Sequence, residues 1–296
     1  MIEEKISNEF LSLTVASRGA EMQSLTRLSD GHEYLWNADA QYWAERAPIL
    51  FPAVGGLWND EARFDGQVYR TPRHGFIKRQ TFSVKSRTQE SITLEHDATE
   101  ETLAVFPFHY HFEVEYRLEK STLNITFRVS HTDSDGRTMY FQVGGHPGFS
   151  LPGFCPTDDI HGYARLEGDA RHVLHTGEQN CLIPGHFDPP ALEPNGLLAL
   201  RDHTTGSSGL IFDHHQLTGV TLLDKEQRPL LRVSCEAAPA TLLWAAEAAP
   251  FICVEPWFGL CDWGGFRGDY SMRPYVNEVA PGGVWQNGFS IEILNP

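Results

Sequence analysis

Three short stretches of the sequence place a histidine or a glutamate beside glycine or proline, at residues 73–76, 144–149 and 254–257. Glycine and proline mark the points where a strand gives way to a turn, and side chains on such connections often form binding or catalytic sites. Histidine and glutamate are residue types that accept and donate protons near neutral pH. The three stretches are therefore candidates for one proton-transfer site.

Glu255 is the most unusual of these residues, because it follows the apolar run at residues 251–254. A carboxylate beside a buried strand is costly to desolvate, so it needs a partner, a ligand or a proton-transfer role. Backbone donors near the strand end would also satisfy it. We expect the chain to turn at Pro256 and to expose Trp257 and Phe258.

The two histidines of the other stretches are His74 and His146. A single histidine flanked by glycine often does no more than hydrogen-bond to its own loop. Two such residues together with Glu255 in one β-rich chain favour a shared site over coincidence.

The elements that must position these residues are strands, because apolar residues recur with a period of two far more often than 3.6. The clearest pair is an antiparallel hairpin at residues 112–118 and 123–129, with one face buried and the other wet. We expect a single short helix at residues 39–45 and long irregular connections between residues 152 and 195. Further strands are expected at residues 10–15, 82–84, 92–94, 139–143, 210–212, 220–223, 230–233, 241–245, 251–254 and 289–294.

Many short strands without a linker-like change of composition predict an all-β fold, one large antiparallel β-sandwich. The chain has 296 residues, of which 41% are hydrophobic and 21% charged, enough to bury a large core. We expect residues 1–296 to form a single domain.

Charge and cysteine content limit the partners and the compartment. The formal net charge of -16 repels polyanions, so we expect neither nucleic acid nor a membrane surface as a partner. The sequence begins without the apolar segment of a secretory signal, and its five scattered cysteines are typical of free thiols in a reducing compartment. A cytoplasmic protein, monomeric or homodimeric, is the expectation.

The chain resembles the aldose 1-epimerase (galactose mutarotase) family, and within it the LacX-like branch. The resemblance rests on the order and spacing of short motifs along nearly the whole chain. These motifs occupy residues 33–36, 42–43, 50–55, 73–76, 106–108, 144–149, 255–259, Asp262 and 281–283. It implies a galactose mutarotase-like supersandwich that binds a monosaccharide and interconverts its α and β anomers.

By the match of motifs, the family's catalytic base is Glu255 and its catalytic acid is His146. Opening a cyclic hemiacetal needs one group to take the proton of the anomeric hydroxyl and another to protonate the ring oxygen. Their reference pKa values, about 4.3 and 6.5, predict an ionised glutamate beside a protonated histidine. The resemblance implies that no metal and no organic cofactor is required.

Four further residues are expected to bind the substrate. His74 matches a family histidine near the sugar ring oxygen, and Asp213 is the nearest match to an aspartate that holds sugar hydroxyls. Arg73 lies beside His74, and Trp257 either stacks on a sugar face or belongs to the core. The sequence departs from the family pattern in two places: related chains often carry an arginine after Gly55, where this chain has Gly56, and the usual Ala-Arg after residues 74–76 is replaced by Ile77-Lys78. The identity of the sugar therefore stays open.

Several alternatives remain. His109 and His111 share one strand face and could bind a metal, but a solvated face explains them without one and is the preferred interpretation. Asp213 with His214 and His215 is a weaker cluster, because neighbours on a strand point to opposite faces. A glycosidase would pair Glu255 with Asp262 but would leave His146 without a role. A sugar-binding sandwich without turnover is another alternative. A hexose-6-phosphate mutarotase would need the cations Arg73, Lys78 and Arg79.

Overall fold

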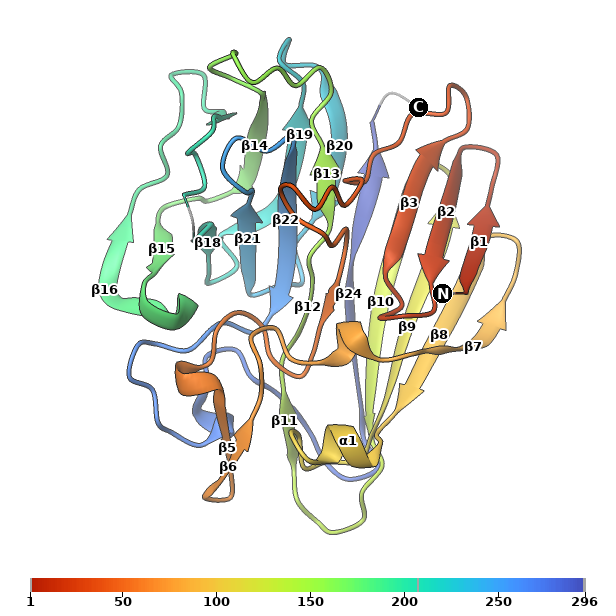
Figure 1. Ribbon diagram of the computed structural model, residues 1–296, viewed down its shortest axis with the longest axis vertical. Helices are drawn as coiled ribbons and strands as arrows, with labels where there is room; N and C mark the ends of the chain where they lie inside the picture. The colour runs from red at the N-terminus through yellow and green to blue at the C-terminus, as the bar shows by residue number, and fades with distance from the viewer. Residues whose placement is uncertain (1, 207, 295–296) are drawn as a thin grey trace.

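The computed structural model describes residues 2–206 and 208–294, and its regular secondary structure there is almost entirely β-strand. Two large antiparallel sheets dominate it (Figure 1). The expectation of an all-β, antiparallel β-sandwich is therefore confirmed. No helix among the described residues is long and apolar enough to cross a membrane.

The first large sheet has nine strands, and the predicted hairpin lies within it. In their order across the sheet, the strands are β17 (Leu198–Leu200), β14 (Gly162–Gly168), β19 (Leu217–Leu223), β20 (Pro229–Ser234), β24 (Val284–Ile293), β10 (Thr122–His131), β9 (Tyr110–Glu119), β8 (Ser91–Asp97) and β7 (Ser83–Arg87). Phe127 pairs with Val114 across β10 and β9, and both side chains are buried. The alternation of the sequence thus sets the register of the hairpin.

The second large sheet has eight strands and carries the candidate site. Across this sheet lie β16 (Leu182–Asp188), β15 (Val173–Thr176), β18 (Leu210–Phe212), β21 (Ala240–Trp244), β22 (Phe251–Phe258), β12 (Val143–Gly145) and β4 (Ile49–Leu50), and β13 (Gly148–Ser150) also pairs with β22. β22 is central, and all eight of its residues are buried.

Smaller elements accompany the two large sheets. They are the three-stranded sheet of β1 (Glu3–Ser7), β2 (Leu11–Ala16) and β3 (Met22–Arg27), the pairs β5 (Glu61–Phe64) with β6 (Gln67–Arg70) and β11 (Met139–Phe141) with β23 (Asn277–Val279), the helix α1 (Glu100–Leu103), and the 3-10 turns η1 (Trp58–Asp60), η2 (Ile77–Arg79), η3 (Glu178–Asn180) and η4 (Tyr270–Met272).

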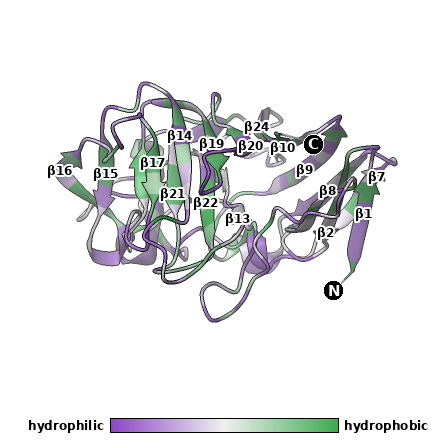
Figure 2. Cartoon of the chain, turned by 90° about the horizontal axis from the view of Figure 1, so that it is seen from above, coloured by the Kyte–Doolittle hydropathy of each residue, from purple (hydrophilic) through white to green (hydrophobic). Residues whose placement is uncertain are grey.

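The main hydrophobic core is one continuous cluster of buried side chains that includes residues of both large sheets, such as Phe127 and Val254. Figure 2 shows hydrophobic colouring on the central strands β21 and β22 and hydrophilic colouring on the edge strand β1. A second, smaller cluster that includes Leu242 and Trp257 covers the other face of the eight-stranded sheet. The single domain over residues 1–296 stays a prediction, which the continuous core supports.

Three expectations about local structure are wrong. Residues 39–45 form only a turn, in which the N–H groups of Tyr42 and Trp43 both donate to the Asp39 carbonyl. The region 152–195 contains β14, β15 and β16 rather than only long connections. The strand after residue 251 does not end before Pro256 but continues to Phe258, because Pro256 pairs with Thr241 without interrupting the ladder.

All five cysteines are free thiols, as expected from their scattered positions, and four of them are buried. Burial raises the pKa of Cys235 and of Cys261 to about 12 in each case. These thiols therefore remain protonated and contribute to packing as small apolar groups.

Candidate active site

Glu255 lies in the middle of β22 and its side chain is 0% exposed. Neighbouring residues of a strand point to opposite faces. Val254 and Phe258 accordingly belong to the main core. Trp257 belongs to the second hydrophobic cluster, on the face of the sheet that carries Glu255. Leu242 of β21 pairs directly with Glu255. The carboxyl group is thus placed on the face of the sheet away from the main core.

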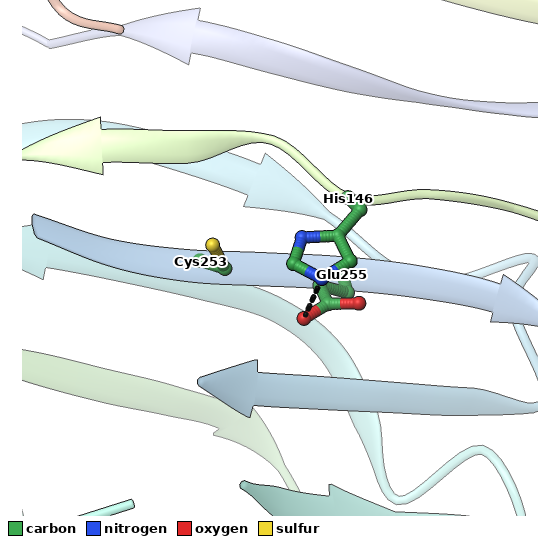
Figure 3. A group of neighbouring side chains, drawn as sticks. All are labelled: His146, Cys253 and Glu255. Carbon is green, nitrogen blue, oxygen red and sulfur yellow. Dashed lines mark ion pairs between the residues drawn. The ribbon is translucent and has the colours of Figure 1, made fainter. Parts of the chain in front are cut away.

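His146 follows β12 and approaches Glu255 from the neighbouring strand (Figure 3). Its Nε2 lies 3.2 Å from Oε1 of Glu255. The ring stacks on Trp43, with 4.8 Å between centroids and 27° between planes, and meets the edge of Trp244 at 5.9 Å. Nδ1 of His146 and Oε1 of Glu255 are buried and make no hydrogen bond. Buried polar atoms without a partner are costly and point to a ligand at this place.

Burial shifts the pKa values of Glu255 and His146 in opposite directions. Desolvation raises the pKa of Glu255 well above its ordinary range, although the charges of Arg73 and Lys78 and the hydrogen bond from Trp257 favour the ionised form. Desolvation also lowers the pKa of His146 to about 3. The order expected from the reference pKa values is therefore reversed, because both buried groups favour their neutral forms.

His74 lies in a tight turn close to His146 and Glu255. Its backbone has a positive φ of 64°, and a Cβ at the following Gly75 would lie 2.1 Å from the carbonyl oxygen of Phe51, so only glycine fits there. Nδ1 of His74 accepts a hydrogen bond from the N–H of Gly55 at 3.1 Å. In the neutral ring the proton must then be on Nε2.

Two influences keep that ring neutral. Burial lowers the pKa of His74 well below its ordinary range, and the positive charge of Arg73 adds to the effect. The rings of His74 and His146 lie 5.6 Å apart in an edge-on arrangement. His74 can therefore supply an Nε2–H donor close to the pair.

A cavity of about 330 Å³ contains these groups. Its lining residues are Trp43, Glu45, Arg73, His74, Lys78, His146, Leu242, Trp244 and Glu255. Small-molecule sites usually have volumes of roughly 300–1,000 Å³ and combine apolar walls with a few convergent polar groups. Nζ of Lys78 lies 2.9 Å from the carboxylate of Glu45, so the positive charge at this wall is partly neutralised.

The structure brings four of the six predicted site residues to this cavity: Arg73, His74, His146 and Glu255. Trp257 lies behind the lining rather than in it. It is 2% exposed, contrary to the expectation of an exposed side chain, and its Nε1–H donates to Oε2 of Glu255 at 3.1 Å. It therefore supports the carboxyl group from within the fold.

Asp213 does not line the cavity. Its Oδ1 accepts a hydrogen bond from His172 Nε2 at 2.8 Å, and its Oδ2 lies 2.7 Å from His214 Nδ1. The carboxylate is 3% exposed and lies just after β18, two strands away from β22 in the same sheet. A role for Asp213 in substrate binding stays a prediction.

Trp43, Trp244, Leu242 and Glu45 are lining residues that the sequence analysis did not assign to the site. Leu242 and Trp244 share the face of β21 whose register partners on β22 are Glu255 and Cys253. A correct pairing of the predicted strands at residues 241–245 and 251–254 would have indicated both. The irregular segment that carries Trp43 and Glu45 offers no such pattern.

Cys253 completes a group of three possible metal ligands with His146 and Glu255, whose ligand atoms lie within 4.8 Å of one another (Figure 3). Burial raises the pKa of the Cys253 thiol well above its ordinary value. A thiol must lose its proton to bind a metal, so this environment disfavours a metal centre.

The structure explains the alternative sites of the sequence analysis in other ways, beginning with the possible metal-binding pair. His109 contacts Asp133, while His111 contacts Asp97 and Glu113, so the two histidines have different carboxylate partners on a partly exposed face.

The carboxylate of Asp262 is bound on both sides. Oδ1 lies 2.8 Å from Nε of Arg273, and Oδ2 accepts a hydrogen bond from the N–H of Trp58. Because Asp262 does not line the cavity, it is not placed to act as the second carboxylate of a glycosidase.

The fold and this cavity define a class of proteins. Two solved structures match nearly all of the chain: a galactose mutarotase related enzyme from Lactobacillus acidophilus, with a TM-score of 0.91, 30% identity and 99% and 98% of the two chains covered, and a galactose mutarotase-like protein from Lactobacillus casei, with a TM-score of 0.90, 27% identity and 99% and 100% covered. The chain has the galactose mutarotase-like fold.

The sequence leads to the same class. The family model described as aldose 1-epimerase matches residues 5–262, and the chain belongs to this family. The chromosomal LacX protein of Lactococcus lactis is 29% identical over 315 residues, covering 98% of this chain and 99% of the relative. The resemblance to the family, including its LacX-like members, is confirmed.

Proposed function

We propose that this protein is an aldose 1-epimerase that interconverts the α and β anomers of an aldohexose, with His146 and Glu255 as its acid–base pair. The observation that carries the proposal is the 3.2 Å separation of His146 Nε2 and Glu255 Oε1 in a cavity of suitable size. Both groups have a buried polar atom that makes no hydrogen bond. A sugar with its many hydroxyl groups would satisfy these atoms.

The proposed reaction begins with the single proton of the pair on His146. Glu255 takes the proton of the anomeric hydroxyl, His146 gives its proton to the ring oxygen, and the C1–ring oxygen bond breaks to leave an open-chain aldehyde. Rotation about the C1–C2 bond and closure with the roles reversed give the other anomer. Each positioned acid or base contributes roughly 10² to 10⁴ in rate.

The electrostatics of the cavity affect the protonation of the pair both when the sugar is open and when it is cyclic. When the sugar is open, Glu255 carries the proton and His146 is neutral, which are the forms that burial favours. When the sugar is cyclic, the ionised carboxylate is favoured by Arg73, Lys78 and the indole N–H of Trp257. The charges of Lys78 and Arg73 also disfavour the protonated form of His146, so the indole N–H is the contribution that opposes burial for the pair as a whole. Opposing influences of this kind keep the two protonation patterns of the pair closer in free energy than burial alone would.

The remaining lining residues have positioning roles in this proposal. His74 would donate its Nε2–H to a sugar oxygen, and Arg73 would donate to a hydroxyl at the cavity wall. Trp43 and Trp244 fix the ring of His146 and offer apolar surface to the C–H face of a sugar. The mechanism asks for no metal ion and no organic cofactor.

The deciding experiment is polarimetry on freshly dissolved α-D-glucose and α-D-galactose. We expect the wild type to accelerate the approach to anomeric equilibrium and Glu255→Gln to lose this acceleration by at least 10²-fold, since it removes the base at constant volume. Glu113→Gln is the matched control, because Glu113 is 5% exposed, paired with Lys85 and Arg128, and located on β9 of the other sheet.

The outcomes separate the candidate functions. Activity of Glu255→Gln within a few-fold of the wild type would refute the mechanism. Sugar binding without acceleration by the wild type would favour a carbohydrate-binding protein without turnover. Full activity of His146→Asn beside an inactive Glu255→Gln would show that another group is the acid.

A hexose-6-phosphate mutarotase is the second candidate, because Arg73 and Lys78 both line the cavity. The contact between Lys78 and Glu45 argues against it, since a phosphate would compete with the carboxylate for the same ammonium group. A neutral aldohexose therefore fits the cavity better.

A further inference from the structure

The edge hairpin of the eight-stranded sheet carries a group of side chains that the proposed epimerase reaction does not use. His175 lies on β15, and His186 and Asp188 lie on β16. Val173 pairs with Asp188 and Leu174 with Phe187. The pairing shifts between Leu174 and Thr176, at His175. The convergence of the ligand atoms of His175, His186 and Asp188 shows that the three side chains nevertheless share one face of the hairpin.

The ligand atoms of these three residues converge. Oδ2 of Asp188 lies 3.1 Å from Nε2 of His175 and 3.8 Å from Nε2 of His186. The two imidazole rings meet at 4.8 Å between centroids, and the three ligand atoms all lie within 4.8 Å of one another. Nε2 of His175 is buried and makes no hydrogen bond.

This geometry is close to what a tetrahedral metal ion requires. Bonds of about 2.0–2.2 Å from Zn²⁺ to imidazole nitrogen and carboxylate oxygen place neighbouring ligand atoms roughly 3.3–3.6 Å apart. The two measured nitrogen–oxygen distances lie on either side of this range. We propose that His175, His186 and Asp188 form a binding site for a divalent transition metal ion of the Zn²⁺ type.

A second histidine–aspartate cluster of the chain shows the difference between such a site and ordinary hydrogen bonding. In that cluster, His172 and His214 each approach a different oxygen of Asp213, and His172 makes a hydrogen bond to it. In the edge hairpin both histidine nitrogens approach the same oxygen of Asp188, and the buried nitrogen has no hydrogen bond. The ligand atoms of both clusters lie within 4.8 Å of one another, but only in the edge hairpin is a buried histidine nitrogen left without a hydrogen bond, among the residues of these two clusters.

The proposed metal site is separate from the candidate active site. Leu174 of β15 pairs with Ile211, Ile211 with Leu242 and Leu242 with Glu255, so these four side chains share one face of the sheet. His175 is the next residue after Leu174 and points to the opposite face. The metal ion and the catalytic pair would therefore lie on opposite faces of one sheet.

A second cavity, of about 590 Å³, adjoins the proposed metal site. His175 and Asp188 line it, together with apolar residues such as Leu198 of β17 in the other large sheet. Three protein ligands leave one tetrahedral position for water or for an oxygen atom of a small molecule in this cavity. The site therefore has the composition of an open metal centre rather than of a closed structural one.

The test is a calorimetric titration of ZnCl₂ into the full-length, tag-free protein after treatment with EDTA. We expect one ion per chain, and we expect His186→Ala and Asp188→Asn each to weaken its affinity by at least tenfold. His203→Ala is the matched control, because His203 lines the same cavity but lies outside the three-residue group. MgCl₂ should not compete, since Mg²⁺ prefers oxygen ligands.

Two results would overturn the proposal: no stoichiometric binding of Zn²⁺ by the wild type, or equal affinities of the wild type, His186→Ala and Asp188→Asn. The side chains of His186 and Asp188 are 53% and 63% exposed, so their replacement should leave the fold intact, which unchanged thermal melting would verify. EDTA should not change the rate of any mutarotation, because the metal site and the proposed catalytic pair share no residue.

Discussion

The indole Nε1–H of Trp257 donates a hydrogen bond of 3.1 Å to Oε2 of Glu255, while the other carboxylate oxygen faces His146 at 3.2 Å. Both Trp257 and Glu255 are buried on the same face of β22. The indole N–H thereby orients the carboxyl group before a ligand binds, and leaves the oxygen beside His146 without a hydrogen bond. We infer that Trp257 is a positioning residue rather than a platform for the sugar.

Replacing Trp257 with phenylalanine should shift the pH dependence of the reaction. A hydrogen bond to a charged group contributes about 1.5–3 kcal/mol, and one pKa unit corresponds to about 1.4 kcal/mol. Because the indole N–H lowers the pKa of Glu255, its loss should move the acid limb of kcat/KM to higher pH by about one unit. Polarimetry over a range of pH would measure this shift.

Trp285→Phe is the control for this experiment, since Trp285 packs against Phe141 and Phe258 and has no contact with the cavity. Its acid limb should coincide with that of the wild type. A uniform loss of activity at every pH in Trp257→Phe would contradict the positioning role and indicate a general loss of packing.

The stability of Glu255→Gln relative to the wild type should depend on pH. The folded pKa of Glu255 is raised, so the folded protein keeps a proton that the unfolded chain releases above about pH 4.5. The contribution of this carboxyl group is fully present below that pH and is lost as the pH rises through the folded pKa. Glutamine does not titrate, so the variant should gain stability over the wild type by up to about 1.4 kcal/mol per pH unit.

Urea denaturation of both proteins at pH 5, 6 and 7 would give this difference. It reports the proton count of the His146–Glu255 pair, whichever of the two residues holds the proton. A difference that does not change with pH would mean that the pair holds no proton at neutral pH. In that case His146 could not act as the acid.

The buried ion pair between Asp262 and Arg273 should stabilise the loops that contain these two residues. The two side chains are 2% and 1% exposed, and Asp262 also accepts from the N–H of Trp58. Removing one partner of a buried pair costs about 3–5 kcal/mol, because the remaining charge loses its compensation. Asp262→Ala should therefore lower the free energy of unfolding by about this amount, measured by urea denaturation.

Asp135→Ala is the matched control, because it breaks an ion pair with Arg137 in which the two side chains are 42% and 39% exposed. Its unfolding curve should nearly coincide with that of the wild type. Equal curves for Asp262→Ala and the wild type would contradict a stabilising role of the buried pair.

The sequence predicts the fold best where one face of a strand is buried and the other is wet. β10 has this alternation over its whole length, and β9 has it except at Glu113, which is buried. β16 lacks it, because six of its seven residues are exposed, and the sequence of this edge strand is therefore indistinguishable from a loop. Pro256 was also misleading, because proline usually ends a central strand, whereas here it remains within the ladder.

The chemical groups of the site could be identified from the sequence, but their surroundings could not. Glu255, His146 and His74 each stand out beside glycine or proline, whereas Trp43 reaches His146 only through the folding of an irregular segment. The reversed pKa order of the acid and base also depends on burial, which reference pKa values do not include. Contacts between distant segments decide both features.

The choice between a neutral sugar and a phosphorylated one should depend on Glu45. Its carboxylate lies 2.9 Å from Nζ of Lys78 at the cavity wall, so a phosphate group must displace it or accept its repulsion. Glu45→Gln removes this competitor at nearly constant volume. The ratio of kcat/KM for glucose 6-phosphate to that for glucose should then rise by up to about tenfold, equivalent to roughly 1.4 kcal/mol.

Lys78→Met should change that ratio in the opposite direction, because it removes the ammonium group that would receive the phosphate. Glu61→Gln is the matched control, since Glu61 pairs with Arg63 and does not line the cavity. An unchanged ratio in Glu45→Gln would mean that a bound phosphate does not reach Lys78. A wild type that already prefers glucose 6-phosphate would instead show that Arg73 and Lys78 outweigh the carboxylate, and would make the phosphorylated sugar the substrate.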